Sequence, residues 1–261
     1  MSLSDHEVAI AAAVAGADVV RRDYGTESVR YAKSATDFAT QTDLDAETAI
    51  MQVIATHRPA DLRTGEESGD SGDDVGSGRR WLIDPLCGTL NFAAATPLVV
   101  INVALLEGGR ARAAAAVDPI AGETFWTDGS KAFVRREDDA ALQPDSVSRL
   151  VEINCDGPLD RPFVGGQLVC DASLRASFGP RVISSTLGVV WVAAGRRAAY
   201  ISDGALRNNL HFAAGIAIAE AAGCIVTDLV GQPLLAGGGL VVSADEITHR
   251  AMLELIEPHL S

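Results

Sequence analysis

The segment WLIDPLCGTLNF, residues 81–92, places an acid, a glycine and a threonine where an apolar run meets the expected start of a helix. Asp84 would end a buried strand, and a desolvated carboxylate there needs a partner, for which a hard divalent cation is suited. The amides of Gly88 and Thr89 would lie at a helix N-terminus, where they can bind a phosphate. The segment therefore predicts a metal beside a phosphate, and Cys87 within it requires an explanation.

Two acidic stretches precede this segment. The first, KSATDFATQTDLDAE, contains Asp43 and Glu47, and the second, GEES, contains Glu66 and Glu67. Taken alone, Gly-Glu-Glu is usually a solvated loop and Asp-Pro is usually a turn. The combination of both stretches with DPLCGT, in this order, is much more specific than any one of them. It indicates a constellation of carboxylates assembled around one site.

These runs resemble the inositol monophosphatase family, whose members are metal-dependent, lithium-sensitive phosphatases of inositol and sugar phosphates. The corresponding stretches are DFATQTD, GEES, DPLCGTLNF and LHFAAGIAIAEAAG, which keep the family order and extend over nearly the whole chain. The resemblance implies an α/β fold, a layered αβαβα sandwich of the inositol monophosphatase type. It also implies a homodimer with two or three Mg²⁺ ions and a small phosphorylated substrate.

The resemblance assigns a role to each matching residue. The first Mg²⁺ would be bound by Glu66, Asp84 and the main-chain carbonyl of Leu86. Thr89, supported by Asp43, would position the attacking water, and the amides of the Gly-Thr turn would hold the phosphate. The reaction would be in-line attack by a metal-activated water, with a second metal stabilising the leaving oxygen. The implied catalytic set is therefore Glu66, Thr89 and Asp43.

Two positions depart from the family pattern, and both belong to the second metal. Cys87 stands where the family has the aspartate before Gly-Thr. His211 stands where it has the aspartate after a tryptophan, and Leu210 replaces that tryptophan. The second set becomes Asp84, Cys87 and His211. Because Mg²⁺ prefers oxygen ligands, we expect a second Mg²⁺ to be weakly bound or absent.

Four interpretations stay open at this point. The protein is a phosphatase that uses one or two Mg²⁺ ions, or the altered set binds a softer metal such as Zn²⁺. Alternatively, Cys87 is a nucleophile with His211 as its base, although CGTLNFA lacks an arginine at the spacing of cysteine phosphatases. Finally, the protein is a degenerate family member that binds a phosphorylated ligand without turnover. Both new residues are themselves metal ligands, which argues against simple decay.

The segment SDGALRNN, residues 202–209, directly precedes Leu210 and His211. In the family it resembles, the corresponding segment selects the substrate. Arg207, Asn208 and Asn209 would therefore contact the alcohol part of the substrate. An apparent insertion lies in this segment, and the sequence does not identify the substrate. Nor does it decide whether a loop at residues 66–80 closes over the site.

The composition limits the classes of partner and compartment. A formal net charge of −14 and a pI of about 4.7 argue against a basic nucleic-acid-binding face. No apolar run reaches membrane-spanning length, and the N-terminus lacks a basic n-region. The four cysteines show no CxxC spacing, so neither a zinc ribbon nor a disulfide framework is indicated. We therefore expect a cytoplasmic protein that binds neither nucleic acid nor membrane.

The elements that must position these residues follow from periodicity and turn signals. Helices are predicted over residues 4–23 and 43–57, and a short buried strand over 81–83. Ser4, with Glu7 three residues on, predicts a capping box at the start of the first helix. The polar run GEESGDSGDDVGSGRR predicts a mobile loop, and Gly108-Gly109 turn a hairpin. A closing helix follows Ser243 as its N-cap.

These elements predict two α/β lobes within one structural unit. Residues 1–145 form the lobe with the GEE and DPLCGT motifs, and residues 146–261 form the lobe with the LHFAAG segment.

Overall fold

The computed structural model describes residues 3–35, 37–72, 78–204, 206, 209–234 and 238–260. The chain divides into two compact units. Unit 1 comprises Met1–Ala140 and Leu210–Ile218, and unit 2 comprises Ala141–Asn209 and Ala219–Ser261. The LHFAAG segment, expected with the C-terminal lobe, thus groups with the N-terminal residues. The contact between His211 and Asp84, described below, gives the physical reason.

Unit 1 is built on a mixed sheet with the strand order β10-β9-β8-β7-β6-β5-β3-β4. The strands are β3 (Leu62–Gly65), β4 (Gly69–Ser71), β5 (Arg79–Cys87), β6 (Val100–Glu107), β7 (Arg110–Asp118), β8 (Glu123–Thr127), β9 (Ala132–Arg135) and β10 (Asp139–Ala141). A separate ribbon pairs β1 (Arg30–Ala32) with β2 (Phe38–Thr40). The hairpin of β6 and β7 turns at Gly108-Gly109, as predicted, and both glycines have positive φ.

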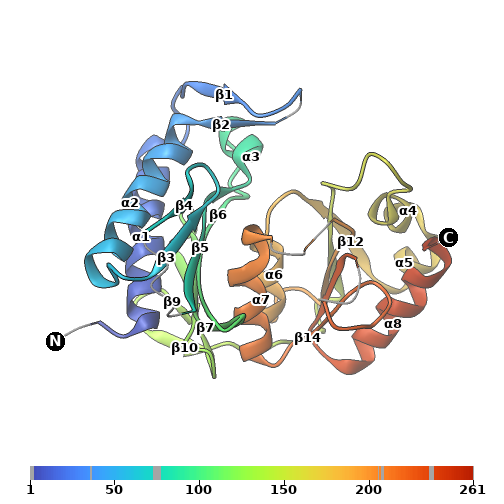
Figure 1. Cartoon of the computed structure of the whole chain (residues 1–261). Coiled ribbons are helices and arrows are strands. Elements are labelled where there is room, and N and C mark those ends of the chain that lie inside the picture. Colours follow the sequence, from blue (N-terminus) through green and yellow to red (C-terminus); the bar gives the residue numbers. More distant parts are fainter. Residues whose placement is uncertain are drawn as a thin grey trace. The chain divides into compact units, whose positions relative to one another are not determined.

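Two long helices, α1 (Asp5–Asp23) and α2 (Gln41–His57), pack together and cover one face of this sheet (Figure 1). Their apolar stripes, with Val8 and Ile50, are buried against Trp81 and Ile101 of the sheet. Ser4 caps α1 through the predicted capping box. Helix α2 begins two residues earlier than predicted because the side chain and backbone of Thr40 pair with Asp43 in a second capping box.

Strand β5 is longer than the three residues predicted for it, because it runs through the whole Asp-Pro-Leu-Cys stretch. The pairing of β5 with β6 shifts register between Asp84 and Cys87. Such a bulge accommodates Pro85, which has no N–H to donate to the ladder. Gly88 then takes the left-handed conformation (φ 99°) before α3 (Thr89–Ala93) starts.

The predicted mobile loop after Glu66 is partly ordered. Strand β4 pairs antiparallel with β3, with Gly65 opposite Gly69, and the Thr64 hydroxyl donates to Asp70 Oδ1 at 2.6 Å. Positive φ at Gly69 permits the tight turn between the two strands. Residues 73–77 of the loop lie outside the described residues. The prediction was therefore wrong for residues 69–71, where a hairpin satisfies the backbone.

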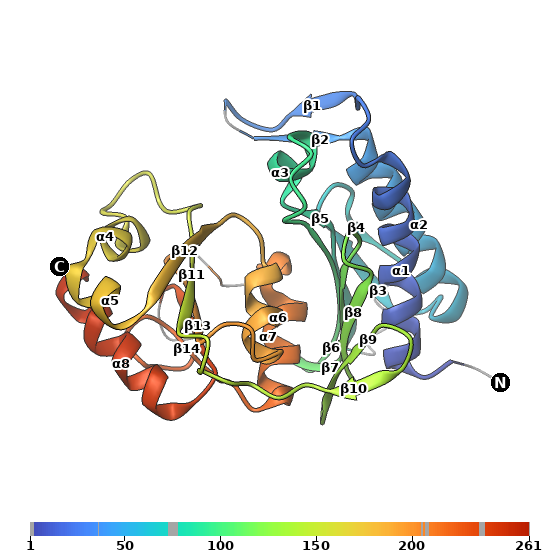
Figure 2. The same cartoon turned by 180° about the vertical axis from the view of Figure 1, so that it is seen from behind.

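Unit 2 is built on a second mixed sheet with the strand order β12-β11-β13-β15-β14. Its strands are β11 (Leu150–Asn154), β12 (Gly179–Ile183), β13 (Ala199–Ser202), β14 (Ile225–Thr227) and β15 (Leu240–Ser243). Helices α4 (Val164–Cys170), α5 (Ala172–Ser177) and α8 (Glu246–Ile256) lie along one face, and α6 (Leu187–Ala193) lies on the other (Figure 2). Helix α7 (Leu210–Ala222) begins in unit 1 and ends in unit 2.

The N-cap predicted for the closing helix α8 was wrong. Ser243 is the last residue of β15, and Asp245 caps α8 by accepting from the Thr248 amide at 2.7 Å. A single 3₁₀ turn (Glu257–His259) follows α8. In the part of the chain that the structure describes, no helix has both the length and the apolar character needed to cross a membrane.

Candidate functional site

Three side chains of unit 1 converge on one point. Glu66 follows β3, Asp84 belongs to β5, and His211 lies in the first turn of α7. One ligand atom from each lies within 4.8 Å of the other two. Among the described residues, this is the group of acidic, histidine and cysteine side chains close enough to share a metal ion.

Asp84 is the buried centre of the group, with none of its surface exposed. Its Oδ1 accepts from the Leu86 amide at 3.2 Å, which fixes the carboxylate across the bulge. Its Oδ2 accepts from Asn102 Nδ2 at 3.4 Å and lies 2.9 Å from His211 Nδ1. The buried carboxylate is therefore oriented by its neighbours, as ligands of metals usually are.

His211 lies between two acids. Its Nδ1 is also 3.8 Å from Glu66 Oε2, and its side chain is 38% exposed. Burial by itself lowers the pKa of His211, but the charge of Asp84, the hydrogen bond to it and the charge of Glu66 together raise that pKa to about 9. Without a bound metal, the imidazole is therefore protonated at neutral pH and balances part of the negative charge.

Glu66 combines burial with a charged neighbour. Burial and the negative charge of Asp84 raise the pKa of Glu66 to about 7. Lys33 Nζ bonds Glu66 Oε1 at 2.7 Å and Glu67 Oε1 at 2.6 Å. Although burial opposes it, pairing with both glutamates raises the pKa of Lys33. The carboxylates of Glu66 and Asp84 thus each have a basic partner, Lys33 and His211 respectively.

A second pair lies at the start of α3. The Thr89 hydroxyl lies 2.9 Å from Asp43 Oδ1 and 3.1 Å from the Leu86 carbonyl. The other oxygen of Asp43 accepts from the backbone and hydroxyl of Thr40, and Asp43 is fully buried. Burial raises the pKa of Asp43. The sequence prediction had paired Thr89 with Asp43, and the two side chains lie in direct contact.

Three other predicted site residues, Leu86, Cys87 and Gly88, lie between Asp84 and Thr89. Leu86 and Gly88 lie in the bulge and the turn between β5 and α3, beside Thr89. Cys87 ends β5, but its sulfur is not part of the group formed by Glu66, Asp84 and His211. The structure therefore brings His211, rather than Cys87, to the two acids.

Of the predicted substrate-contacting residues, Arg207 and Asn208 lie outside the described residues. Asn209 immediately precedes α7, and its amide donates to the Leu206 carbonyl at 3.0 Å. The role of Asn209 in substrate binding stays a prediction.

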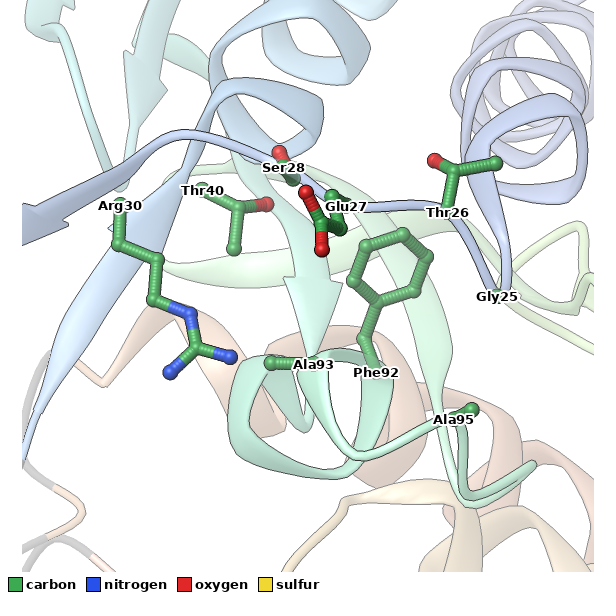
Figure 3. Close-up of a pocket in the computed structure, with 9 residues that line it drawn as sticks. All are labelled: Gly25, Thr26, Glu27, Ser28, Arg30, Thr40, Phe92, Ala93 and Ala95. Atoms are coloured by element: carbon green, nitrogen blue, oxygen red, sulfur yellow. The ribbon is translucent and has the colours of Figure 1, made fainter.

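A cavity of about 430 Å³ in unit 1 is lined in part by Thr40. The segment of residues 25–30 forms one side of it, and Phe92, Ala93 and Ala95 form the opposite side (Figure 3). Neither Glu66, Asp84 nor His211 lines it, so this cavity is distinct from the metal-capable group.

Sequence reasoning missed two contributors. Asn102 was not singled out, although it lies opposite Asp84 in the register of β5 and β6. Glu47 was noticed only as one acid in a stretch; the structure buries it, with 3% of its surface exposed, where it accepts from the amides of Glu67 and Ser68. Its position four residues after Asp43 was a usable signal, since residues four apart share a helix face.

Comparison with known proteins supplies an independent line of evidence. The sequence profile of the inositol monophosphatase family matches residues 4–261. An inositol-1-monophosphatase of Mesorhizobium japonicum is 31% identical, and the match covers 97% of this chain and 96% of that protein. A Nus factor SuhB of Pseudomonas aeruginosa is 29% identical, over 87% of this chain and 86% of that protein.

Solved structures agree with the sequence matches. The crystal structure of the extragenic suppressor protein suhB from Bartonella henselae superposes with a TM-score of 0.84 at 26% identity, covering 96% of this chain and 97% of that chain. The IMPase of Thermotoga maritima, at 22% identity and a TM-score of 0.80 over 97% of both chains, shows the same fold. The fold is the predicted layered α/β sandwich, and the chain belongs to the inositol monophosphatase family.

Proposed function

We propose that this chain is a metal-dependent phosphomonoesterase that hydrolyses a small polyol, inositol or sugar phosphate. One observation carries the proposal: the Glu66–Asp84 carboxylates lie next to a turn in which Thr89 contacts a buried Asp43. A metal-binding pair and a hydroxyl oriented by a carboxylate are the two components that hydrolysis by an activated water requires.

The donor set fits a hard cation at the first metal position. Glu66 and Asp84 offer carboxylate oxygens, and the Leu86 carbonyl, whose oxygen lies 3.1 Å from the Thr89 hydroxyl, adds a neutral oxygen with two lone pairs. These three residues would hold Mg²⁺. When bound, the ion supplies Lewis-acid polarisation of the phosphate and lowers the pKa of a coordinated water.

The residues of the chain then orient the reaction. The Thr89 hydroxyl donates its proton to Asp43, so its oxygen can accept a hydrogen bond from the attacking water. The raised pKa of Asp43 strengthens it as an acceptor within this relay. The amides of Gly88 and Thr89 would bind the phosphate oxygens, and Asn208 and Asn209 would contact the alcohol portion.

The His211 side of the group favours a second candidate function for the same site. An imidazole nitrogen close to two carboxylates forms a nitrogen–oxygen set suited to Zn²⁺ or another borderline metal. In this version the metal is held by Glu66, Asp84 and His211 without the Cys87 thiolate. The degenerate alternative, a binder of phosphorylated ligands without turnover, uses the same residues but lacks the metal that activates water.

One screen separates these functions. Purified protein is stripped of metal and assayed for phosphate release from inositol, fructose and nucleotide phosphates with Mg²⁺, Mn²⁺ or Zn²⁺. We expect release with Mg²⁺ or Mn²⁺, and release with Zn²⁺ alone would favour the second candidate. No release with any metal, together with a Tm raised by the phosphate esters, would overturn the phosphatase proposal in favour of a binder.

A further inference from the structure

We propose that Glu47 is a positioning residue that holds the Glu66 carboxylate at the metal site. The inference rests on the proposed function because it concerns how the first metal ligand is presented. Glu47 lies on α2, outside the group that contacts the metal. It acts through the backbone of the segment that follows Glu66.

The contacts of Glu47 are made with main-chain donors. Its Oε2 accepts from the Glu67 amide at 2.8 Å, and its Oε1 accepts from the Ser68 amide at 2.9 Å. The residue is 3% exposed, so these are buried, charge-assisted hydrogen bonds. One carboxylate thus satisfies two consecutive amides that no strand partner reaches.

The result is that Glu66 is held on both sides. Its own amide donates to the Ile83 carbonyl at 3.1 Å, which extends the parallel pairing of β3 with β5 by one residue. The two residues after it are held by Glu47. With the backbone fixed before and after Glu66, its side chain starts from a defined position, from which Oε2 lies 3.8 Å from His211 Nδ1.

The Glu47 carboxylate also lies against Gly65, the residue before Glu66. A Cβ atom on Gly65 would lie 2.5 Å from both Cδ and Oε2 of Glu47 and 2.6 Å from its Oε1. The carboxylate therefore occupies the space that any side chain at position 65 would need. The glycine of the Gly-Glu-Glu motif is required here by the close approach of Glu47, since its φ is not positive.

Two buried carboxylates of helix α2 each hold a residue of the site in place. Asp43 and Glu47 are four residues apart and both buried, so they lie on one face of α2. Asp43 fixes the Thr89 hydroxyl, and Glu47 fixes the Glu66 segment. One helix, α2, therefore positions both Thr89, the proposed water-orienting residue, and Glu66, the proposed metal ligand. Precise sites require such support from a rigid element.

Mn²⁺ binding tests the proposal without relying on turnover. Glu47→Gln replaces one acceptor oxygen with an NH₂ group that faces an amide N–H, so it loses a hydrogen bond and the charge. We expect Mn²⁺ affinity, measured by electron paramagnetic resonance of the free ion, to fall about 10- to 100-fold. Glu47→Asp, which keeps the charge on a shorter side chain, should recover part of this loss.

Asp118→Asn is the matched control. Asp118 is 4% exposed in unit 1, and it accepts from two turn amides, those of Ile120 and Ala121, at 2.9 and 2.8 Å. Neutralising this buried carboxylate should leave Mn²⁺ affinity within about twofold of the wild-type value, whatever it does to Tm. Equal loss of affinity in both variants would overturn the proposal, because it would reduce the role of Glu47 to general stability.

A double-mutant cycle at Gly65 gives a second test. Gly65→Ala should lower Mn²⁺ affinity as Glu47→Ala does, since each separates the carboxylate from the two amides. The double variant should then be no weaker than either single variant, whereas independent effects would multiply and contradict the proposal. If wild-type protein binds Mn²⁺ but releases no phosphate, the proposed function fails while these binding results still decide the role of Glu47.

Discussion

Asp84 separates two sides of the site that differ in how they are built. On one side, Glu66 offers carboxylate oxygens, and its neighbouring backbone is bonded to β5 and to a buried acid of α2. On the other, His211 comes from the first turn of α7, and Cys87 lies at the end of β5 outside the three-residue group. The first side offers hard carboxylate oxygens with their supports, while the second offers an imidazole nitrogen and, outside the three-residue group, a thiol. Metal chemistry should therefore depend on the first side far more than on the second.

Removing the first-side ligand should give the largest effect. Glu66→Gln is expected to lower kcat/KM for Mg²⁺-dependent phosphate release by about a thousandfold, about 4 kcal/mol of transition-state stabilisation. Glu67→Gln is the matched control, because Glu67 pairs with the same lysine at 2.6 Å but lies outside the group. Its kcat/KM should stay within about threefold of wild type. Similar losses in both variants would mean that the lysine pairing, rather than metal ligation, is what matters.

The water-orienting pair should come next. Thr89→Val keeps the shape of the side chain but removes the hydroxyl that contacts Asp43, so kcat should fall about a hundredfold with little change in KM. Thr89→Ser retains the hydroxyl and should keep most of the activity. Steady-state kinetics on both variants make the comparison. A valine variant with wild-type kcat would remove Thr89 from the mechanism.

Placing carboxylates on the second side tests the difference directly. Cys87→Asp combined with His211→Asp supplies two oxygen ligands and two negative charges, so Mg²⁺-dependent kcat should rise about tenfold as a second ion binds. Cys87→Asn with His211→Asn is the control, since it offers amide oxygens without the charges. Measuring kcat over a series of Mg²⁺ concentrations distinguishes the aspartate double variant from the asparagine double variant. A fall in the aspartate variant would identify the histidine as a functional part of the present site.

The sequence predicted the parts of the fold that local patterns encode. The capping box at Ser4, the Gly108-Gly109 hairpin and the pairing of Thr89 with Asp43 all follow from spacing or from the family motif, and the structure contains each of them. The fold class was also predicted, because the motifs keep their order over nearly the whole chain. These features are short-range, or are tied to residues whose identity allows few alternatives.

What could not be predicted depends on contacts between distant segments. The hairpin after Glu66 was missed because polar, glycine-rich residues suggest a loop unless the neighbouring strand is known. Cys87 and His211 are both metal ligands by type, and only the folded arrangement shows that His211 joins the two acids while Cys87 lies outside the group. Likewise, nothing in the sequence shows that a carboxylate on α2 fills the space beside Gly65.

A buried histidine of unit 2 extends the comparison and gives the smallest expected effect. His249 faces hydroxyls instead of acids, Ser243 Oγ at 3.2 Å from Nδ1 and Thr227 Oγ1 at 3.1 Å from Nε2, and burial lowers its pKa. Between the ordinary pKa of about 6.5 and this lower value, the unfolded chain binds more protons, so the folded state loses stability as pH falls through that window. Tm measured in chelator from pH 7.5 to 5 should drop less steeply for His249→Gln than for wild type, by no more than about 3 °C at the acid end. His57→Asn, at the exposed end of α2, should leave the slope unchanged, and an unaltered slope in His249→Gln would show that the acid sensitivity arises elsewhere.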